Sequence, residues 1–112
     1  MLPAAARMVR QSFDAYRTAD RAEIEALLHP DFTFTSPYDD HIDRAAYFER
    51  CWPLAGTFVY QELIQVSVVD DVVVVLYDGE SKTGVRFRNM ERVAFEDGLI
   101  RAVEVFFGRP SA

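Results

Sequence analysis

The feature that most constrains this chain is a pair of strands in its C-terminal third. Residues 85–95 and 99–107 are rich in β-branched and aromatic side chains, as strands are. The sequence Glu96-Asp97-Gly98 separates them, and Asp-Gly tolerates the positive φ angles of a tight hairpin turn. The first strand presents on one face four apolar residues with an amide and a carboxylate between them: Val85, Phe87, Asn89, Glu91, Val93 and Phe95.

The carboxylate on this apolar face needs a physical reason. A buried carboxylate is costly unless it is paired, hydrogen-bonded or protonated. A polar point inside an apolar cavity would supply that reason, so Glu91 is our first candidate for a catalytic group, either as a protonated donor or as an ionised base. The alternative is structural, with Glu91 paired to an arginine on a neighbouring strand or lying on a solvated face. Asn89, two residues earlier, would either orient a ligand or hydrogen-bond Glu91.

Composition narrows the class of protein. The chain has 112 residues, which we interpret as a single domain over 1–112, and half of the residues are hydrophobic, as in globular proteins. The net charge of −6 argues against a nucleic-acid partner. No apolar run has the length of a membrane span, so we expect no membrane partner. Cys51 is the only cysteine and is expected to be a small buried hydrophobe rather than a nucleophile, which fits a cytoplasmic location.

Hydrophobic periodicity predicts an α+β fold. Three helices are expected, over 4–18, from a cap at Asp20 to His29-Pro30, and over 44–52 after a cap at Asp43. His29 is expected to cap the end of the second helix. Strands are expected over 31–36, 58–69, 71–78, 85–95 and 99–107, and a loop over 37–42. We therefore expect three N-terminal helices to pack on one face of a curved, mainly antiparallel sheet.

An unbroken apolar strand predicts a partner. The sequence Val72-Val73-Val74-Val75-Leu76-Tyr77 must be covered on both faces of the sheet, and three short helices can cover only one. A second copy of the chain would cover the other face. We therefore expect a homodimer.

Three segments resemble the nuclear transport factor 2-like superfamily, which includes ketosteroid isomerases and SnoaL-like polyketide cyclases. They are Phe13-Asp14-Ala15-Tyr16 running into Ala19-Asp20, the stretch from Leu27 to Pro37 with Leu28-His29-Pro30-Asp31-Phe32, and the closing hairpin from Phe95 to Gly108. The resemblance implies a cone-shaped fold with a ligand cavity. It is specific for fold rather than for function, because the superfamily contains enzymes, binders and scaffolds.

The chain departs from the ketosteroid isomerases at the residues that carry their chemistry. Ser36 stands before Pro37 where those enzymes have the proton-shuttling aspartate, and Ser12 or Phe13 falls where they have a tyrosine. Only the second oxyanion-hole group of those enzymes, a carboxylic acid, has a counterpart, which is Glu91. In those enzymes an apolar site keeps that acid neutral. A serine without a partner is no proton-shuttling base at neutral pH, so steroid isomerisation by the known mechanism is not expected.

Other candidates lie in the expected loop and on the expected cavity wall. His41 beside Asp39 and Asp40 suits acid–base chemistry, although the same residues are typical of an ordinary turn. One histidine without ligand spacing does not indicate a metal, and we expect no metal or cofactor. Tyr16 and Trp52 would either line the pocket or pack in the core. The full set of candidate ligand-binding residues is Tyr16, Phe32, Phe34, Ser36, Tyr38, Trp52, Phe87, Asn89 and Phe107.

Two functions follow from these residues. The first is a SnoaL-like domain that binds a small hydrophobic ligand in an apolar pocket and transfers a proton, as in isomerisation, cyclisation or dehydration. The second is a non-catalytic dimeric binding or interaction module, in which Glu91 is structural and phenylalanines fill the cavity. A cavity of about 300 Å³ or more that reaches Glu91 would favour the first.

Overall fold

The computed structural model describes residues 4–111, and their side chains from residue 4 to residue 108. Three α-helices, one 3₁₀ helix and six strands follow one another in these residues. Their bounds are α1 Ala4–Thr18, α2 Arg21–Leu27, β1 Leu28–Ser36, β2 Asp39–Asp43, α3 Arg44–Arg50, η1 Trp52–Leu54, β3 Phe58–Val69, β4 Val72–Ser81, β5 Arg86–Glu96 and β6 Leu99–Ser111.

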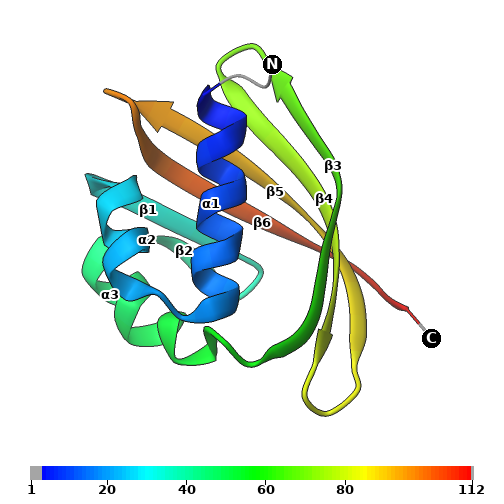
Figure 1. The fold of residues 1–112 in the computed structure, drawn as a ribbon. Helices are drawn as coiled ribbons and strands as arrows, with labels where there is room; N and C mark the ends of the chain where they lie inside the picture. The colour runs from blue at the N-terminus through cyan, green and yellow to red at the C-terminus, as the bar shows by residue number, and fades with distance from the viewer. Residues whose placement is uncertain (1–3, 112) are drawn as a thin grey trace.

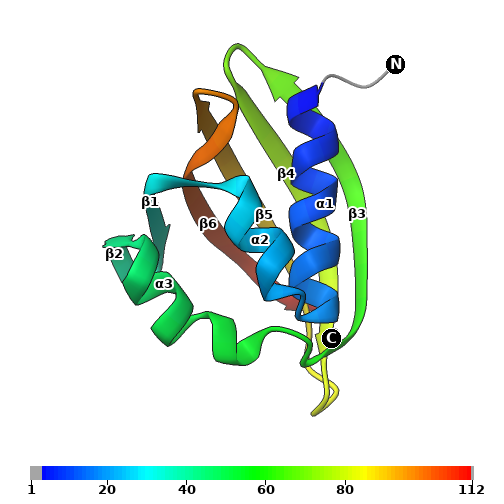
Figure 2. The same cartoon turned by 60° about the vertical axis from the view of Figure 1, so that its left-hand side comes forward.

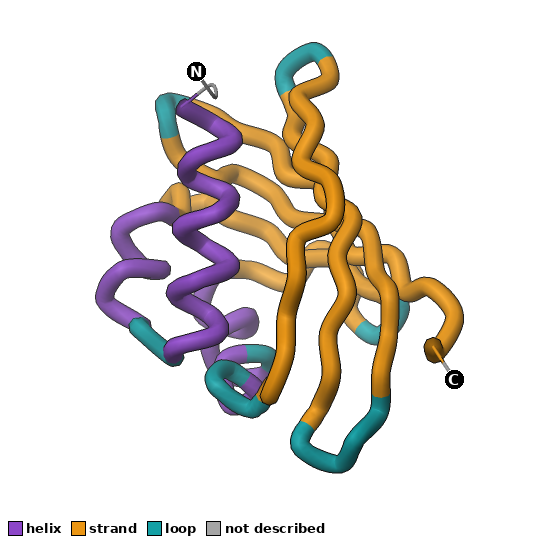
Figure 3. The backbone as a smooth tube through the Cα atoms, turned by 45° about the vertical axis from the view of Figure 1, so that its right-hand side comes forward, coloured by secondary structure: helices purple, strands orange, loops and turns teal. Residues whose placement is uncertain are grey.

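The six strands form one curved, mostly antiparallel sheet in the order β2-β1-β6-β5-β4-β3. Only β1 and β6 run parallel; every other neighbouring pair is antiparallel. The helices lie on one side of the sheet, and β3 and β4 bend around α1 (Figures 1 and 2). Successive hairpins connect β3 to β6, and their turns project at opposite ends of the sheet (Figure 3). The expected α+β class and curved sheet are confirmed.

Two expectations about element order are wrong. The helices are not all N-terminal, because β1 and β2 separate α2 from α3. The expected loop over 37–42 is largely the strand β2, which pairs with β1 as an antiparallel hairpin. Its turn is only Pro37 and Tyr38, and a β-bulge opposite Thr35 absorbs an additional residue. The bulge breaks the simple alternation by which a strand is recognised in a sequence.

The helix caps form as expected from their side chains. Asp20 accepts a hydrogen bond from the Glu23 backbone N–H at 3.2 Å, and Asp43 accepts one from Ala46 at 2.9 Å. Each aspartate satisfies a backbone donor that the helix leaves free at its N-terminus. The expected cap at the end of α2 is wrong: Leu28 occupies that place, and its N–H bonds to Ile24 while His29 already belongs to β1.

The two faces of the sheet differ in burial. On β4 the side chains of Val73, Val75 and Tyr77 are buried under the helices, whereas those of Val74 and Leu76 on the other face are only partly covered. Phe32, Ile100, Val9, Val73, Val75 and Val93 are the largest fully buried side chains. Within residues 4–111, no helix has the length and apolar character needed to cross a membrane.

Candidate functional site

A cavity of about 560 Å³ lies between the helices and the inner face of the sheet. Its walls are mostly apolar and aromatic, with a few polar groups among them, which is the usual make-up of a small-molecule site. Eight of the residues expected at the site line it: Tyr16, Phe32, Phe34, Tyr38, Phe87, Asn89, Glu91 and Phe107. The expected residues that do not line it are Ser36, Asp39, His41 and Trp52.

Glu91 is the acidic group of the cavity. It lies on the inner face of β5, directly opposite Val75 of β4. Burial raises the pKa of Glu91 from 4.5 to about 7, because the apolar surroundings disfavour the charged form; a hydrogen bond from Tyr77 opposes this shift. At neutral pH, protonated and ionised forms of Glu91 are therefore both populated.

The partner of Glu91 is Tyr77, a residue that the sequence analysis did not single out. The Tyr77 hydroxyl donates to Glu91 Oε2 at 2.7 Å. In the sheet register Tyr77 faces Asn89, so Tyr77 and Glu91 are diagonal neighbours on the inner face of two adjacent strands. Knowledge of this register would have identified the pair. Tyr77, rather than the arginine that we had considered as an alternative, is the partner of Glu91.

Asn89 extends this polar group. Its Nδ2 lies 3.4 Å from the Tyr77 hydroxyl, and its Oδ1 accepts a long hydrogen bond of 3.4 Å from the backbone N–H of Gly108. Burial, followed by the charge of Glu91, raises the pKa of Tyr77. Tyr77 therefore stays a hydroxyl donor over the whole physiological range, and Asn89 holds it from the side.

Two further titratable side chains that line the cavity keep their protons at neutral pH. The Tyr16 hydroxyl donates to the carbonyl oxygen of Cys51 at 2.9 Å, and burial raises the pKa of Tyr16. Burial also raises the pKa of the Cys51 thiol to about 11, with Asp39 adding to the shift. A thiol with this pKa is almost fully protonated at neutral pH, which agrees with the non-nucleophilic interpretation of Cys51.

The mouth of the cavity is marked by its exposed lining residues. Tyr38 is 79% exposed and its ring packs edge-on against Phe107, which is 50% exposed. Val85, 55% exposed, lies on the β4–β5 turn and also lines the cavity. The cavity therefore opens between the β1–β2 turn, the β4–β5 turn and the C-terminal half of β6.

Phe87 forms part of the wall because the facing residue on β4 is a glycine. Gly79 is buried opposite Phe87, and a Cβ atom at that position would lie 2.4 Å from the Phe87 ring. The ring therefore lies directly over the backbone of β4. It makes an edge-on contact with Phe58 at a centroid distance of 5.5 Å.

The expected acid–base pair around His41 does not reach the cavity, and this part of the site hypothesis is wrong. The His41 side chain is 75% exposed, and its Nδ1 lies 2.6 Å from Asp40 Oδ1. His41 has a positive φ of 48° in the bulge of the edge strand β2, which directs it to solvent. Asp39 instead lies 2.6 Å from Arg50 Nη2 at the end of α3, an ion-pair contact that lacks hydrogen-bond geometry at Oδ1.

Ser36 and Trp52 have structural contacts. The Ser36 hydroxyl donates to Asp39 Oδ2 at 3.3 Å and accepts from the backbone N–H of Tyr38, so it stabilises the β1–β2 turn. Trp52 packs edge-on against Tyr16 at 5.6 Å and lies against Phe48 at 5.7 Å. The core alternative for Trp52 therefore matches its position.

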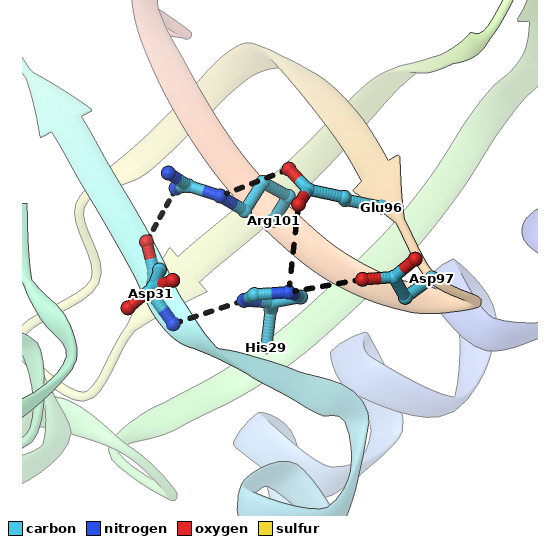
Figure 4. A network of polar contacts seen from close by, with 5 residues as sticks. All are labelled: His29, Asp31, Glu96, Asp97 and Arg101. Carbon is cyan, nitrogen blue, oxygen red and sulfur yellow. Dashed lines mark hydrogen bonds and ion pairs between the residues drawn. The ribbon is translucent and has the colours of Figure 1, made fainter.

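A second polar cluster lies at the other end of β1 (Figure 4). His29 Nε2 lies 3.8 Å from Glu96 and 3.7 Å from Asp97, and Arg101 contacts Glu96 and the carbonyl of Asp31. The ligand atoms of His29, Glu96 and Asp97 are close enough together to suggest a cation site. However, His29 Nδ1 accepts the Asp31 N–H at 2.9 Å, so in neutral imidazole the proton lies on Nε2 and leaves no lone pair for a metal there.

The fold and cavity define a class of protein. Helices on the concave side of a curved sheet, with a cavity between them, are the architecture of the nuclear transport factor 2-like superfamily. Within it, the chain belongs to the SnoaL-like domain family, whose sequence model matches residues 9–103. No curated protein matches the sequence.

Solved structures with the same fold have diverse descriptions. A putative ketosteroid isomerase from Kribbella flavida superposes with a TM-score of 0.81 at 17% identity, covering 97% of this chain and 81% of the other. An LEH-like epoxide hydrolase of M. tuberculosis has a TM-score of 0.74 at 18% identity, with coverages of 94% and 83%. An NTF2-like protein of unknown function from Cytophaga hutchinsonii has a TM-score of 0.77 at 18% identity, with coverages of 96% and 93%. At these identities the likeness extends to the fold alone.

Proposed function

We propose that this protein binds a small, uncharged and mainly apolar molecule in the cavity and that Glu91 exchanges a proton with it. The observation that carries the proposal is a carboxyl group in an apolar cavity with one hydrogen-bond partner, Tyr77, and a pKa raised to about 7. General acid–base catalysis is most effective when the pKa lies near the working pH.

The free oxygen of Glu91 gives this carboxyl group access to a ligand. Oε2 accepts from Tyr77, whereas Oε1 has no hydrogen-bond partner in the described part of the chain and is not sealed off from solvent. An ionised Glu91 could therefore remove a proton from a carbon atom next to a carbonyl group, and the protonated form could return one to the same or another carbon. Isomerisation, cyclisation and dehydration all include such a step.

Deuterium exchange tests the proposal without knowledge of the natural substrate. 1-Tetralone, an uncharged bicyclic ketone, is incubated with the protein in D₂O, and loss of its α-protons is followed by NMR. The α-proton passes to Glu91, exchanges with solvent as the carboxyl proton, and a deuteron returns to the carbon. We expect Glu91→Gln to slow the protein-dependent exchange by about 100-fold or more, because Gln cannot act as the base.

Binding is measured separately with N-phenyl-1-naphthylamine, an uncharged fluorescent probe. Val103 lines the cavity, so Val103→Phe should reduce its volume and weaken binding of the probe. The matched control is Val59→Phe, because Val59 is 61% exposed and lies outside the cavity lining. Binding that both variants leave unchanged would contradict a ligand site in the cavity.

The non-catalytic alternative remains distinguishable from the enzyme. If the probe binds in the cavity while wild-type and Glu91→Gln proteins exchange 1-tetralone at the same rate as buffer, the protein is a binding module. The cavity of about 560 Å³ favours ligand binding over a plugged cone, since drug-sized sites begin near about 300 Å³.

The proposal includes a homodimer formed through the outer face of the sheet, in the cytoplasm. Leu76, Met90 and Phe106 are in register across β4, β5 and β6, and Met90 and Phe106 are 41% and 50% exposed. A continuous apolar row of this kind is typical of a contact between protein surfaces. Light scattering should show a dimer at micromolar concentration and a monomer for Met90→Glu, with Val59→Glu as control; a wild-type monomer would refute the dimer.

A further inference from the structure

Tyr47 is a cavity residue whose hydroxyl has no assigned role. Its ring lies in the first turns of α3 and is fixed by contacts with Phe32, Phe34 and Phe48 at centroid distances of 5.2, 5.3 and 5.3 Å. The residue is only 9% exposed and lines the cavity. Aromatic packing accounts for the ring, but phenylalanine would pack in the same way.

The hydroxyl of Tyr47 is what requires a further explanation. Among residues 4–111 no group hydrogen-bonds it, yet the oxygen is not completely sealed from solvent. Buried tyrosine hydroxyls usually have a hydrogen-bond partner. A hydroxyl that is buried without one loses its hydrogen bonds to water and gains none in return. Tyr16 illustrates the usual case, since its hydroxyl donates to the Cys51 carbonyl.

Tyr47 shares its surroundings with other titratable groups of the cavity. Burial raises the pKa of Tyr47 most, and the charges of Tyr16, Glu91 and Cys51 raise it further. All three of these groups line the same cavity as Tyr47, so Tyr47 shares the cavity with Glu91. Because its pKa is raised, the hydroxyl keeps its proton at neutral pH and can donate a hydrogen bond to an acceptor.

We propose that Tyr47 is the hydrogen-bond donor that holds the oxygen atom of a bound ligand, so that the cavity selects apolar carbonyl compounds over hydrocarbons of the same shape. This inference rests on the proposed function and deepens it by naming the ligand class. The aromatic walls bind the hydrocarbon skeleton, Tyr47 binds the oxygen, and Glu91 faces the ligand with its free Oε1. A carbonyl oxygen is the acceptor expected, because it is a strong acceptor that needs no proton of its own.

Tyr47→Phe tests the inference, since it removes one oxygen atom and leaves the ring contacts in place. Affinities for 1-tetralone and for tetralin, which has the same skeleton without the carbonyl, are measured by calorimetry on wild-type and variant. We expect the variant to bind 1-tetralone about fivefold to tenfold more weakly and tetralin equally well. The carbonyl stretching frequency of bound 1-tetralone should also be higher in the variant, because the hydrogen bond that lowers it is lost.

Tyr60→Phe is the matched control. Tyr60 lies on β3 outside the cavity lining. Removing its hydroxyl should change the affinity neither for 1-tetralone nor for tetralin. The thermal stability of Tyr47→Phe should equal or exceed that of wild-type, because the hydroxyl contributes no bond within the described chain.

The outcomes separate the two proposals. If wild-type protein binds neither compound, the ligand cavity itself is refuted and the role of Tyr47 with it. If both compounds bind but Tyr47→Phe lowers the two affinities equally, or lowers the affinity for 1-tetralone less than twofold, the cavity proposal stands and the role of Tyr47 is refuted. An unchanged carbonyl frequency would also refute it.

Discussion

The two faces of the hairpin formed by β4 and β5 place carboxyl groups in opposite environments. On the inner face burial raises the pKa of Glu91 to about 7, with only the Tyr77 hydroxyl to stabilise the charge. On the outer face Arg88 donates two hydrogen bonds to Asp78, at 2.7 and 3.1 Å, and holds its pKa below the usual value. The side of the strand, rather than the type of residue, decides which acid titrates near neutral pH.

This difference distinguishes the cavity on the inner face of the sheet from the solvated outer face. Arg86 and Arg88 of the outer face are exposed and form ion pairs with Glu80 and Asp78. Such exposed pairs are hydrated and add little to stability. Burial of the Glu91 carboxyl group costs stability, and this cost beside a cavity supports the proposed role of Glu91.

The largest expected effect comes from removing the ionisable group of the inner face. The pKa of Glu91 is higher in the folded chain than the ordinary value of 4.5, so the folded state binds the proton more tightly and stability falls as the pH rises from about 4.5 to about 7. The shift corresponds to about 3 kcal/mol. The free energy of unfolding of Glu91→Gln, minus that of wild-type, should therefore be about 3 kcal/mol larger at pH 8 than at pH 4.

Denaturant unfolding across this pH range measures that difference, and comparing the two proteins cancels the titration of all other groups. Asp78→Asn is the control from the outer face. Its own difference from wild-type should have the opposite pH trend, since the pairing of Asp78 is lost as the pH falls through its lowered pKa. A pH-independent difference for Glu91→Gln would mean that Glu91 is not desolvated.

A second comparison uses valines that alternate between the faces of β4. Val75 is completely buried, so Val75→Ala should cost about 2–3 kcal/mol of unfolding free energy through lost contacts and a cavity. Val74→Ala on the partly covered outer face should cost less than about 1 kcal/mol in the monomer. Equal losses measured below the dimer dissociation constant would contradict the assigned faces of the strand.

The third prediction concerns the hydrogen bond between Tyr77 and Glu91. Tyr77→Phe removes the donor that stabilises the ionised carboxylate, so the pKa of Glu91 should rise above about 7 by about one unit. Carbon-13 NMR of the Glu91 carboxyl group through a pH titration measures the shift. A pKa that stays unchanged or falls would show that the hydroxyl does not donate to Glu91 in solution.

The smallest effect is expected on the outer face. Arg88→Ala removes the partner of Asp78, but both side chains are solvated, so the melting temperature should stay close to that of wild-type at physiological salt. Differential scanning calorimetry at low and high salt checks this, with any loss confined to low salt. A large, salt-independent loss would place the ion pair in a desolvated contact, such as the proposed dimer interface.

Local chemistry made much of this protein predictable. The expected cap residues Asp20 and Asp43 form their hydrogen bonds, because capping depends on neighbours within three residues. The strand pattern also placed Phe87, Asn89 and Glu91 together on the face that lines the cavity, since alternation along a strand is a local property. The Asp97-Gly98 turn has the positive φ angles that its sequence favours.

The errors arose where a residue's role depends on distant parts of the chain. His41 looked like an acid–base residue, but the bulge that turns it to solvent exists only through pairing of β2 with β1. The sequence analysis did not single out Tyr77 or Tyr47, because their place at the cavity depends on strand register and helix packing rather than on their neighbours in the chain.

The sequence by itself therefore determined most of the helices and strands and the face on which Glu91 lies, because these follow from periodicity and from contacts between near neighbours. Its motifs indicated the family by resemblance. Only the tertiary structure decided which groups meet around the cavity. The register of β4 against β5 pairs Tyr77 with Glu91, and the packing of α3 against β1 brings Tyr47 into the same cavity. The pKa of Glu91 depends on that enclosure, since desolvation is a property of everything around a group rather than of its neighbours in the chain.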